Sequence, residues 1–197
     1  MEIKKDYIRV TELLKPWQDW GNIPKDVLEA KAEIGTNVHD AIAMHAMGLP
    51  IPILTERESR YFDSYLKWEE YENPTYICTE QRYYDEDLML TGQVDAIVSF
   101  PGRPEGRILD FKTSSKALPL HWPIQLGWYY MLCLKNNVHI SETAMMLQLK
   151  DNGSPAKSYV YPLTHGILGV CKSLYESYIY FNPQIIANHN HESSWCC

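Results

Sequence analysis

Residues 75–113 constrain the fold of this sequence most, because β-branched and aromatic residues dominate them and turn-forming residues interrupt them twice. The strand-like segments are 75–84 (TYICTEQRYY), 88–100 (LMLTGQVDAIVSF) and 107–113 (RILDFKT). The acidic residues 85–87 and the Pro- and Gly-containing residues 101–106 supply the turns between them. Because strands joined by short turns pair side by side, this stretch predicts a three-stranded antiparallel meander.

Helical patterns precede and follow the meander. Thr55 and Glu58 form a T-x-x-E capping box ahead of one helix, and Thr164 can cap the last helix. The remaining predicted elements are a short strand or turn entering a helix over 8–20, helices over about 25–47, 56–71, 120–136 and 165–181, and strands over 143–150 and 157–161. This order predicts an α/β (α+β) fold in which helices cover both faces of a central mixed β-sheet.

The chain has 197 residues and no Gly/Ser- or Pro-rich linker, so we expect a single domain over residues 1–197. Within it we expect a helical N-terminal part over about 8–72, a sheet-containing core over about 75–181 and a tail over 182–197. A chain of this size can bury most of its apolar surface in one core.

The composition excludes several classes of protein. The 18 Lys and Arg against 25 Asp and Glu give a net charge of −7, which argues against a general polyphosphate-coating protein but allows a local basic groove. No apolar run approaches the ~20 residues that span a bilayer, and the N-terminus lacks the apolar segment of a secretion signal. The five cysteines contain no C-x-x-C pair, which favours reduced thiols and a cytoplasmic location.

Two aspartates and a lysine interrupt the predicted strands. Asp110 and Lys112 are two residues apart on one strand, so their side chains point to the same face. Asp95 lies on the preceding strand, and antiparallel pairing can bring it beside Asp110. Two converging carboxylates repel each other unless a cation lies between them. Oxygen ligands of this kind suit Mg²⁺ or Mn²⁺, and a lysine beside them can hold a water molecule or stabilise a phosphate, as metal-assisted phosphodiester hydrolysis requires.

Simpler interpretations of these residues exist. An Asp-x-Lys on a strand is usually a solvent-exposed ion pair. Here, however, apolar residues flank both aspartates, and a buried charge needs a partner. A sugar hydrolase would use Asp95 and Asp110 as acid and base, but it would leave Lys112 unexplained.

Four motifs then follow one another along the chain. They are Gly35-Thr36-Asn37-Val38-His39, Gly92-Gln93-Val94-Asp95, ILDFKTS at 108–114 and Gln125-Leu126-Gly127-Trp128-Tyr129. Together, over roughly residues 8–135, they resemble the PD-(D/E)XK nuclease superfamily in its RecB-like exonuclease branch. The short opening VTELL and the compact chain look most like phage recombination exonucleases, and the mitochondrial genome maintenance exonuclease is similar. The resemblance implies a restriction-endonuclease-like core.

The resemblance also implies a set of metal ligands. These are Asp95, Asp110, the Phe111 backbone carbonyl and, from the helical side, His39. Glu80, on the strand before Asp95, is a candidate ligand of a second metal ion. The alternative for Glu80 is a pair with Arg82 or a place in solvent.

Three further residues receive catalytic roles from the resemblance. Lys112 would orient or help deprotonate the attacking water. Gln125 would brace the lysine or the scissile phosphate, and Tyr129 would contact DNA or the metal shell. Gln125 and Tyr129 are four residues apart, so they share one face of their helix.

The function implied is a Mg²⁺- or Mn²⁺-dependent deoxyribonuclease that digests DNA, single-stranded or duplex, from its ends. Recombination or repair in the cytoplasm of a bacterial or phage-infected cell is the implied setting, and a recombination protein is a candidate partner. Polarity, strand preference, exonucleolytic against endonucleolytic cleavage, processivity and oligomeric state stay open. The alternative is a non-catalytic nucleic-acid- or protein-binding module that keeps the fold; the net charge favours it, and the intact Asp95, Asp110 and Lys112 oppose it.

A nuclease of this charge needs basic residues close to its site. The candidates are Lys31, Arg103, Arg107, Lys116, Lys150 and Lys157. Because they are sparse, we expect a narrow channel for one strand or a frayed end, where Trp17, Trp20 or Trp122 could stack on bases. Packing in the core is the more common role for each of these tryptophans. The C-terminal HNHESSWCC has the composition of a loose tail, and its cysteines lack the spacing of an iron–sulfur site.

Overall fold

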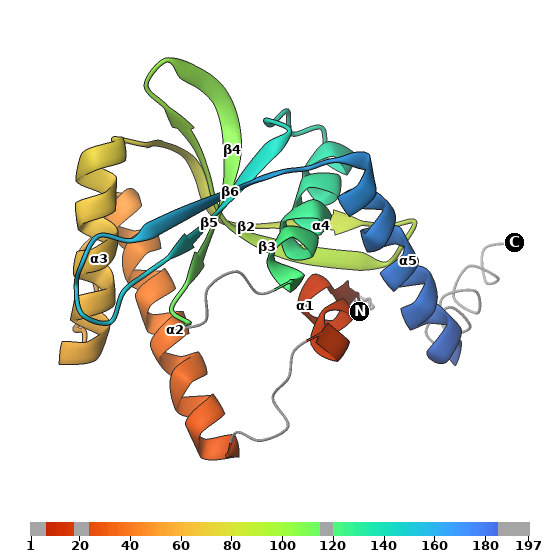
Figure 1. Cartoon of the computed structure of the whole chain (residues 1–197), viewed down its shortest axis with the longest axis horizontal. Coiled ribbons are helices and arrows are strands. Elements are labelled where there is room, and N and C mark those ends of the chain that lie inside the picture. Colours follow the sequence, from red (N-terminus) through yellow and green to blue (C-terminus); the bar gives the residue numbers. More distant parts are fainter. Residues whose placement is uncertain (1–6, 18–23, 115–119, 185–197) are drawn as a thin grey trace, which may run out of the picture.

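The computed structural model describes residues 7–17, 24–114 and 120–184, which form a six-stranded mixed sheet flanked by five α-helices (Figure 1). The strands are β1 (Ile8–Arg9), β2 (Thr75–Asp85), β3 (Leu90–Phe100), β4 (Arg103–Lys112), β5 (Thr143–Gln148) and β6 (Lys157–Pro162). The helices are α1 (Val10–Leu13), α2 (Lys25–Ala46), α3 (Glu56–Glu72), α4 (His121–Lys135) and α5 (His165–Phe181), with a 3₁₀ turn at Lys15–Trp17. The predicted α/β (α+β) class, with helices around a central mixed sheet, is confirmed.

The strands follow the order β1-β3-β4-β5-β6, and β2 pairs with β3 outside this path. Strands β2, β3 and β4 pair antiparallel, which confirms the predicted meander. Strand β5 pairs in parallel with β4 and antiparallel with β6. A parallel neighbour requires a long crossover, and the segment that contains α4 supplies it.

Local sequence signals account for the ends of the elements. The Thr55 hydroxyl accepts a hydrogen bond from the Glu58 N–H at 3.4 Å, and the Glu58 carboxylate accepts one from the Thr55 N–H at 2.7 Å, so the predicted capping box forms. Helix α3 then ends at Glu72, and the residue that caps it, Asn73, has a left-handed φ of 47°. Strand β4 begins earlier than predicted, at Arg103, because the turn before it is tight: Phe100 pairs directly with Arg103. Between them Gly102 has a φ of 72°, which glycine adopts without steric cost.

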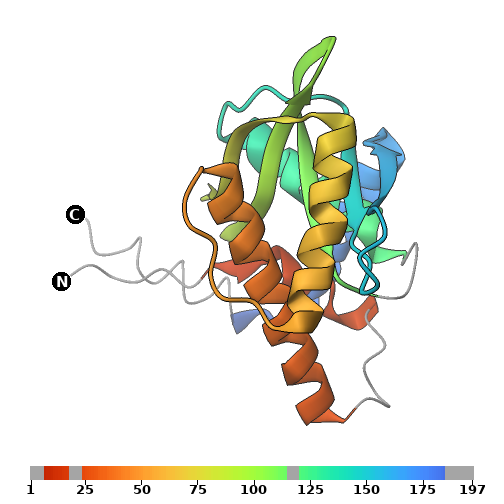
Figure 2. The same cartoon turned by 90° about the vertical axis from the view of Figure 1, so that its left-hand side faces the viewer.

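The core consists of two clusters of apolar side chains, one on each face of the sheet. Helices α2 and α3 lie side by side over one face, and α4 and α5 lie over the other (Figures 1 and 2). The α2–α3 side contains Val38, Ile42, Tyr65, Trp68 and Phe111. The α4–α5 side contains Leu126, Trp128, Leu132 and Cys171. None of the described helices is both long enough and apolar enough to cross a membrane.

Strand β3 has a different neighbour at each end along one edge. It pairs with β1 at Leu90 and Thr91, and with β4 from Ala96 to Phe100. Along its other edge it pairs with β2 over nearly its whole length. Residues 92–95 therefore lie at a fork, where β4 has separated from β3. This fork faces both α2 and α4, and it is where the motif residues meet.

Candidate metal and catalytic site

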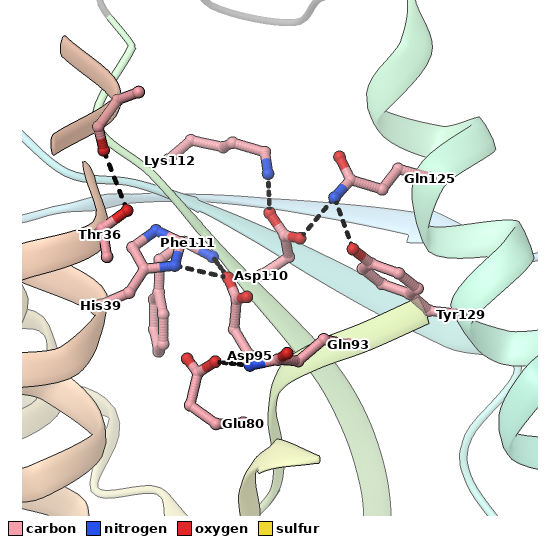
Figure 3. A network of polar contacts seen from close by, with 11 residues as sticks. Thr36, His39, Glu80, Gln93, Asp95, Asp110, Phe111, Lys112, Gln125 and Tyr129 are labelled. Carbon is pink, nitrogen blue, oxygen red and sulfur yellow. Dashed lines mark hydrogen bonds and ion pairs between the residues drawn. The ribbon is translucent and has the colours of Figure 1, made fainter. Parts of the chain in front are cut away.

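Side chains from four elements converge at the fork (Figure 3). His39 reaches it from α2, Asp95 and Asp110 come from β3 and β4, and Gln125 and Tyr129 come from α4. Residues from all four motifs therefore lie together in the folded chain. The cleft beside the fork brings Lys112 and His39 together with the middle turns of α2.

Asp95 substitutes for the strand pairing that is lost at the fork. Its Oδ2 accepts a hydrogen bond of 2.8 Å from the Phe111 backbone N–H, one residue beyond Asp110. The same oxygen lies 3.4 Å from Nδ1 of His39. Burial alone would raise the pKa of Asp95, but His39, Lys112 and the Phe111 N–H together hold it below its usual range. Asp95 is therefore an ionised carboxylate in a buried position.

His39 is oriented by two neighbours, Asp95 and the Phe111 ring, which meets the imidazole edge to face at 5.6 Å between ring centres. Burial would lower the pKa of His39, but Asp95 outweighs it, so the pKa is raised. The predicted ligand role of the Phe111 carbonyl stays a prediction.

Glu80 lies opposite Asp95 across the β2–β3 pair. The register pairs Thr79 with Ala96 and Gln81 with Val94, which places Glu80 beside Asp95. Two like charges directly opposite each other destabilise a sheet. Glu80 also has a φ of 50°, a left-handed conformation that non-glycine residues adopt only at a cost and often at functional sites.

The three side chains have the spacing of a metal site. One ligand atom each from His39, Glu80 and Asp95 lies within 4.8 Å of the other two. Ligands on opposite sides of one ion are up to about 5 Å apart, twice a bond of about 2.0–2.6 Å. Oε1 of Glu80 is buried and has no hydrogen-bond partner among the described residues. A buried oxygen without a partner and two facing carboxylates are the features that a bound divalent cation would satisfy, so these residues fit the metal ion that the motifs imply.

Glu80 does not adopt the alternative arrangement expected for it. Its Oε2 accepts a hydrogen bond from the Gln93 amide, and the Arg82 guanidinium donates to the other end of that amide. Glu80 is half-buried, and its pKa is raised. Burial is the larger cause, and the charge of Asp95 adds to it. The expected direct pair with Arg82, or a place in solvent, is therefore wrong.

Asp110 belongs to a second group, on the α4 side. Its Oδ2 forms an ion pair with Lys112 Nζ, and its Oδ1 accepts a hydrogen bond of 3.0 Å from Gln125 Nε2. The same amide nitrogen lies 3.0 Å from the Tyr129 hydroxyl. The expected shared strand face of Asp110 and Lys112, and the shared helix face of Gln125 and Tyr129, are both present. The predicted role of Asp110 as a metal ligand stays a prediction.

The environment of Asp110 opposes its charge. Its side chain is 1% exposed. Burial raises the pKa to about 6, Lys112 works against that rise, and Asp95 adds to it. Asp95 and Asp110 therefore have pKa values displaced in opposite directions, a pattern that is common where two acids have different tasks.

An open cleft of about 310 Å³ runs from His39 along α2. Its lining residues are Lys31, Ala32, Gly35, Thr36, His39, Phe111, Lys112, Thr113 and Ser114. None of these described lining residues carries a carboxylate, although the whole chain has a net charge of −7. Another hollow lies on α5, but its lining residues (Gly166, Gly169, Val170, Ser173, Leu174 and Ser177) offer no titratable group.

The other candidate DNA contacts have varied positions. Lys31 lines the cleft, whereas the Arg107 guanidinium lies over the Phe100 ring at 5.6 Å. Trp122 is 1% exposed and packs against Tyr159, so it is a core residue, which confirms the packing role expected for it and excludes base stacking. Lys116, Trp20 and the tail residues 185–197 lie outside the described residues.

Sequence reasoning missed two polar residues inside its own motifs. Asn37 donates a hydrogen bond of 2.7 Å to Glu58 and so joins α2 to the start of α3. Gln93 bridges Glu80 and Arg82. A signal for Gln93 was available, because it lies two residues before Asp95 and therefore on the same strand face.

Two comparisons with known proteins bear on this geometry. A family model described as the PD-(D/E)XK nuclease superfamily matches residues 10–167. The matched region contains all the residues at the fork and most of the chain. Among curated proteins, none matches the chain.

Proposed function

The chain belongs to the PD-(D/E)XK nuclease superfamily, and we propose on that premise that it is a divalent-metal-dependent DNA exonuclease. It would hydrolyse phosphodiester bonds at a single-stranded or frayed DNA end. We place it in the RecB-like branch, close to phage recombination exonucleases. The proposed setting is recombination or repair in a bacterial or phage-infected cell, with a recombination protein as a candidate partner.

The observation that carries the proposal is the pairing of two groups at one fork. His39, Glu80 and Asp95 have metal-ligand spacing, and the Asp110–Lys112 pair lies next to them on β4. We propose that Mg²⁺ or Mn²⁺ is held there by Asp95, His39 and Glu80, with Asp110 and the Phe111 carbonyl as the further ligands implied by the motifs. When bound, such an ion polarises the scissile phosphate and lowers the pKa of a water molecule.

The chain's own residues then have separate tasks. Gln125 fixes the orientation of the Asp110 carboxylate through Oδ1, which leaves Oδ2 facing Lys112. The Lys112 side chain, which is 21% exposed, lies between this buried carboxylate and the cleft, where its ammonium can hold the attacking water or stabilise charge on the phosphate. Tyr129 shares a hydrogen bond with Gln125 and stays protonated, because burial raises its pKa. In-line attack by water would leave a 5′-phosphate on the product.

The cleft supports one strand rather than a duplex as the substrate. It is lined by two lysines and the hydroxyl residues Thr36, Thr113 and Ser114, which suit a phosphodiester backbone. Lys31 lies two helical turns from His39 on the same face of α2 and would contact a neighbouring phosphate. The sparse positive charge agrees with a narrow path along one strand.

End-labelled single- and double-stranded DNA, incubated with Mg²⁺ or with EDTA, tests the proposal. Linear DNA should be digested only with Mg²⁺, and circular single-stranded DNA should stay intact. Lys112→Ala should slow digestion by about 10²–10⁴-fold, the usual scale for a positioned proton-transfer or electrostatic group. Lys135→Ala is the matched control, because Lys135 forms a Lys–Asp pair with Asp87 on the surface.

Each arm can contradict a different part of the proposal. Cleavage of circular DNA would refute an exonuclease, and digestion in EDTA would refute the need for metal. A Lys112→Ala variant that digests DNA at the parental rate would leave Asp110 and Lys112 as a structural ion pair. No digestion by the parental chain under any condition would favour the non-catalytic binding module.

A further inference from the structure

Gln93 lies at the centre of four polar side chains on two strands. On β3 it is two residues before Asp95, and on β2 it pairs directly with Arg82, which is two residues after Glu80. Residues two apart on a strand, and their cross-strand partners, share one face of the sheet. The Gln93 amide accepts a hydrogen bond from Arg82 Nη2 through Oε1 and donates one to Glu80 Oε2 through Nε2 (Figure 3 shows the bond to Glu80).

The two neighbours force one orientation on this amide. A guanidinium can only donate hydrogen bonds, and an ionised carboxylate can only accept them. The amide oxygen must therefore face Arg82 and the amide nitrogen must face Glu80. No other uncharged side chain of this length offers one acceptor and one donor at its tip.

Glu80 needs this support because both its backbone conformation and the position of its charge are energetically unfavourable. Its φ of 50° lies in the left-handed region, and its carboxylate lies opposite that of Asp95. With Oε2 bound to Gln93, the remaining oxygen, Oε1, is the buried atom without a hydrogen-bond partner among the described residues. Glu80 belongs to the group whose ligand atoms lie within 4.8 Å of one another.

We propose that Gln93 is a positioning residue: it holds the Glu80 carboxylate so that one oxygen is free for the metal ion, and it couples that carboxylate to the guanidinium of Arg82. This inference rests on the metal site of the proposed function. Hydrogen bonds to the ligands of a metal orient the ligands, and their loss typically costs 10–100-fold in metal affinity.

The test measures Mn²⁺ binding to the full chain by calorimetry and by the electron paramagnetic resonance signal of the bound ion. Gln93→Met keeps the length and removes both hydrogen bonds, and Gln81→Met is the matched control. Gln81 is an exposed neighbour on β2 whose amide donates a hydrogen bond to the Arg82 backbone carbonyl. We expect about 10-fold weaker Mn²⁺ binding for Gln93→Met, parental binding for Gln81→Met, and thermal unfolding close to parental for both.

A double variant distinguishes a positioning role of Gln93 from a general loss of packing around it. Glu80→Gln removes the charge that Gln93 is proposed to hold, so adding Gln93→Met to it should weaken Mn²⁺ binding less than about 2-fold further. Parental Mn²⁺ affinity in Gln93→Met, or an undiminished effect of Gln93→Met in the Glu80→Gln background, would overturn the inference. Parental protein that binds no Mn²⁺ would overturn both the inference and the metal site. If binding depends on Gln93 but DNA stays intact, the positioning role stands and the exonuclease proposal fails.

Discussion

Asp110→Asn is expected to make the metal-free protein more stable while abolishing its activity. Asp110 is 1% exposed, and burial raises the pKa of its carboxyl to about 6 even though Lys112 lies beside it. Asparagine has the shape of the protonated acid, and its Oδ1 can still accept the hydrogen bond from Gln125. The variant therefore removes a buried charge without removing the shape that surrounds it. It also removes a predicted metal ligand and the partner of Lys112.

The size of the effect follows from the two pKa values. The Asp110 carboxyl has a pKa of about 6 in the folded chain and of about 3.8 in the unfolded chain. Between these pH values the folded chain therefore binds one proton that the unfolded chain has lost. The contribution of Asp110 to stability is therefore most favourable below about pH 3.8 and is lost as the pH rises through about 6. At about 1.4 kcal/mol per pH unit, the ionised carboxylate costs on the order of 3 kcal/mol at neutral pH. Asp110→Asn should recover most of this free energy of unfolding.

Urea unfolding in EDTA, from pH 4.5 to 8, measures this difference. The variant should exceed the parent by about 2–3 kcal/mol at pH 7.5, and the gap should narrow as the pH falls. Asp87→Asn is the control, because that carboxylate is 77% exposed and its pair with Lys135 is expected to contribute under about 1 kcal/mol. A variant less stable than the parent at pH 7.5 would refute the reasoning, because the ion pair with Lys112 would then outweigh the cost of burial.

Three further predictions concern the supports of the site. Gly92→Ala would place a Cβ 2.9 Å from the Tyr129 ring, so we expect urea unfolding to show a loss of about 1–3 kcal/mol and digestion to slow; parental stability would contradict this close packing. Lys31→Ala should reduce the slope of log binding constant against log salt concentration for single-stranded DNA by about 0.7. Fluorescence anisotropy without metal measures this slope, and Lys25→Ala, at the start of α2, should leave it unchanged. Glu58→Gln should cost about 1 kcal/mol at pH 7. Hydrogen bonds, first of all from the capping threonine hydroxyl, lower the pKa of Glu58, so its contribution is present above about pH 4.5 and disappears as the pH falls; an undiminished cost of Glu58→Gln in acid would contradict it.

Much of the site could be predicted because it depends on spacing within single elements. Asp110 and Lys112 share a face since side chains alternate along a strand, and Gln125 and Tyr129 share a face since helical residues four apart are neighbours. The helix bearing His39 could be placed from its own pattern, as could the capping box at Thr55. These signals are local, and the folded chain preserves them.

The arrangement around Glu80 could not be predicted, because it depends on backbone geometry that spacing does not encode. Nothing in TYICTEQRYY indicates that Glu80 has a left-handed φ, or that the register places it opposite Asp95. A regular strand would allow the direct pair between Glu80 and Arg82. In the structure Gln93 lies between the two, and the free Glu80 oxygen is left among His39 and Asp95.

The fork in the sheet explains why an acidic site can exist inside an apolar core. Where β4 separates from β3 after the Ala96–Leu109 pair, the Phe111 N–H loses its partner on β3, and the Asp95 carboxylate replaces it. Asp95 therefore satisfies a buried backbone group as well as contributing to the metal-ligand group. On its other edge β4 stays paired with β5 through Asp110 and Lys112, which holds their side chains in place. A substitution of Asp95 should consequently weaken folding and metal binding together. A substitution of Asp110 should weaken metal binding without weakening the fold, because the strand pairing around Asp110 uses its backbone and not its side chain.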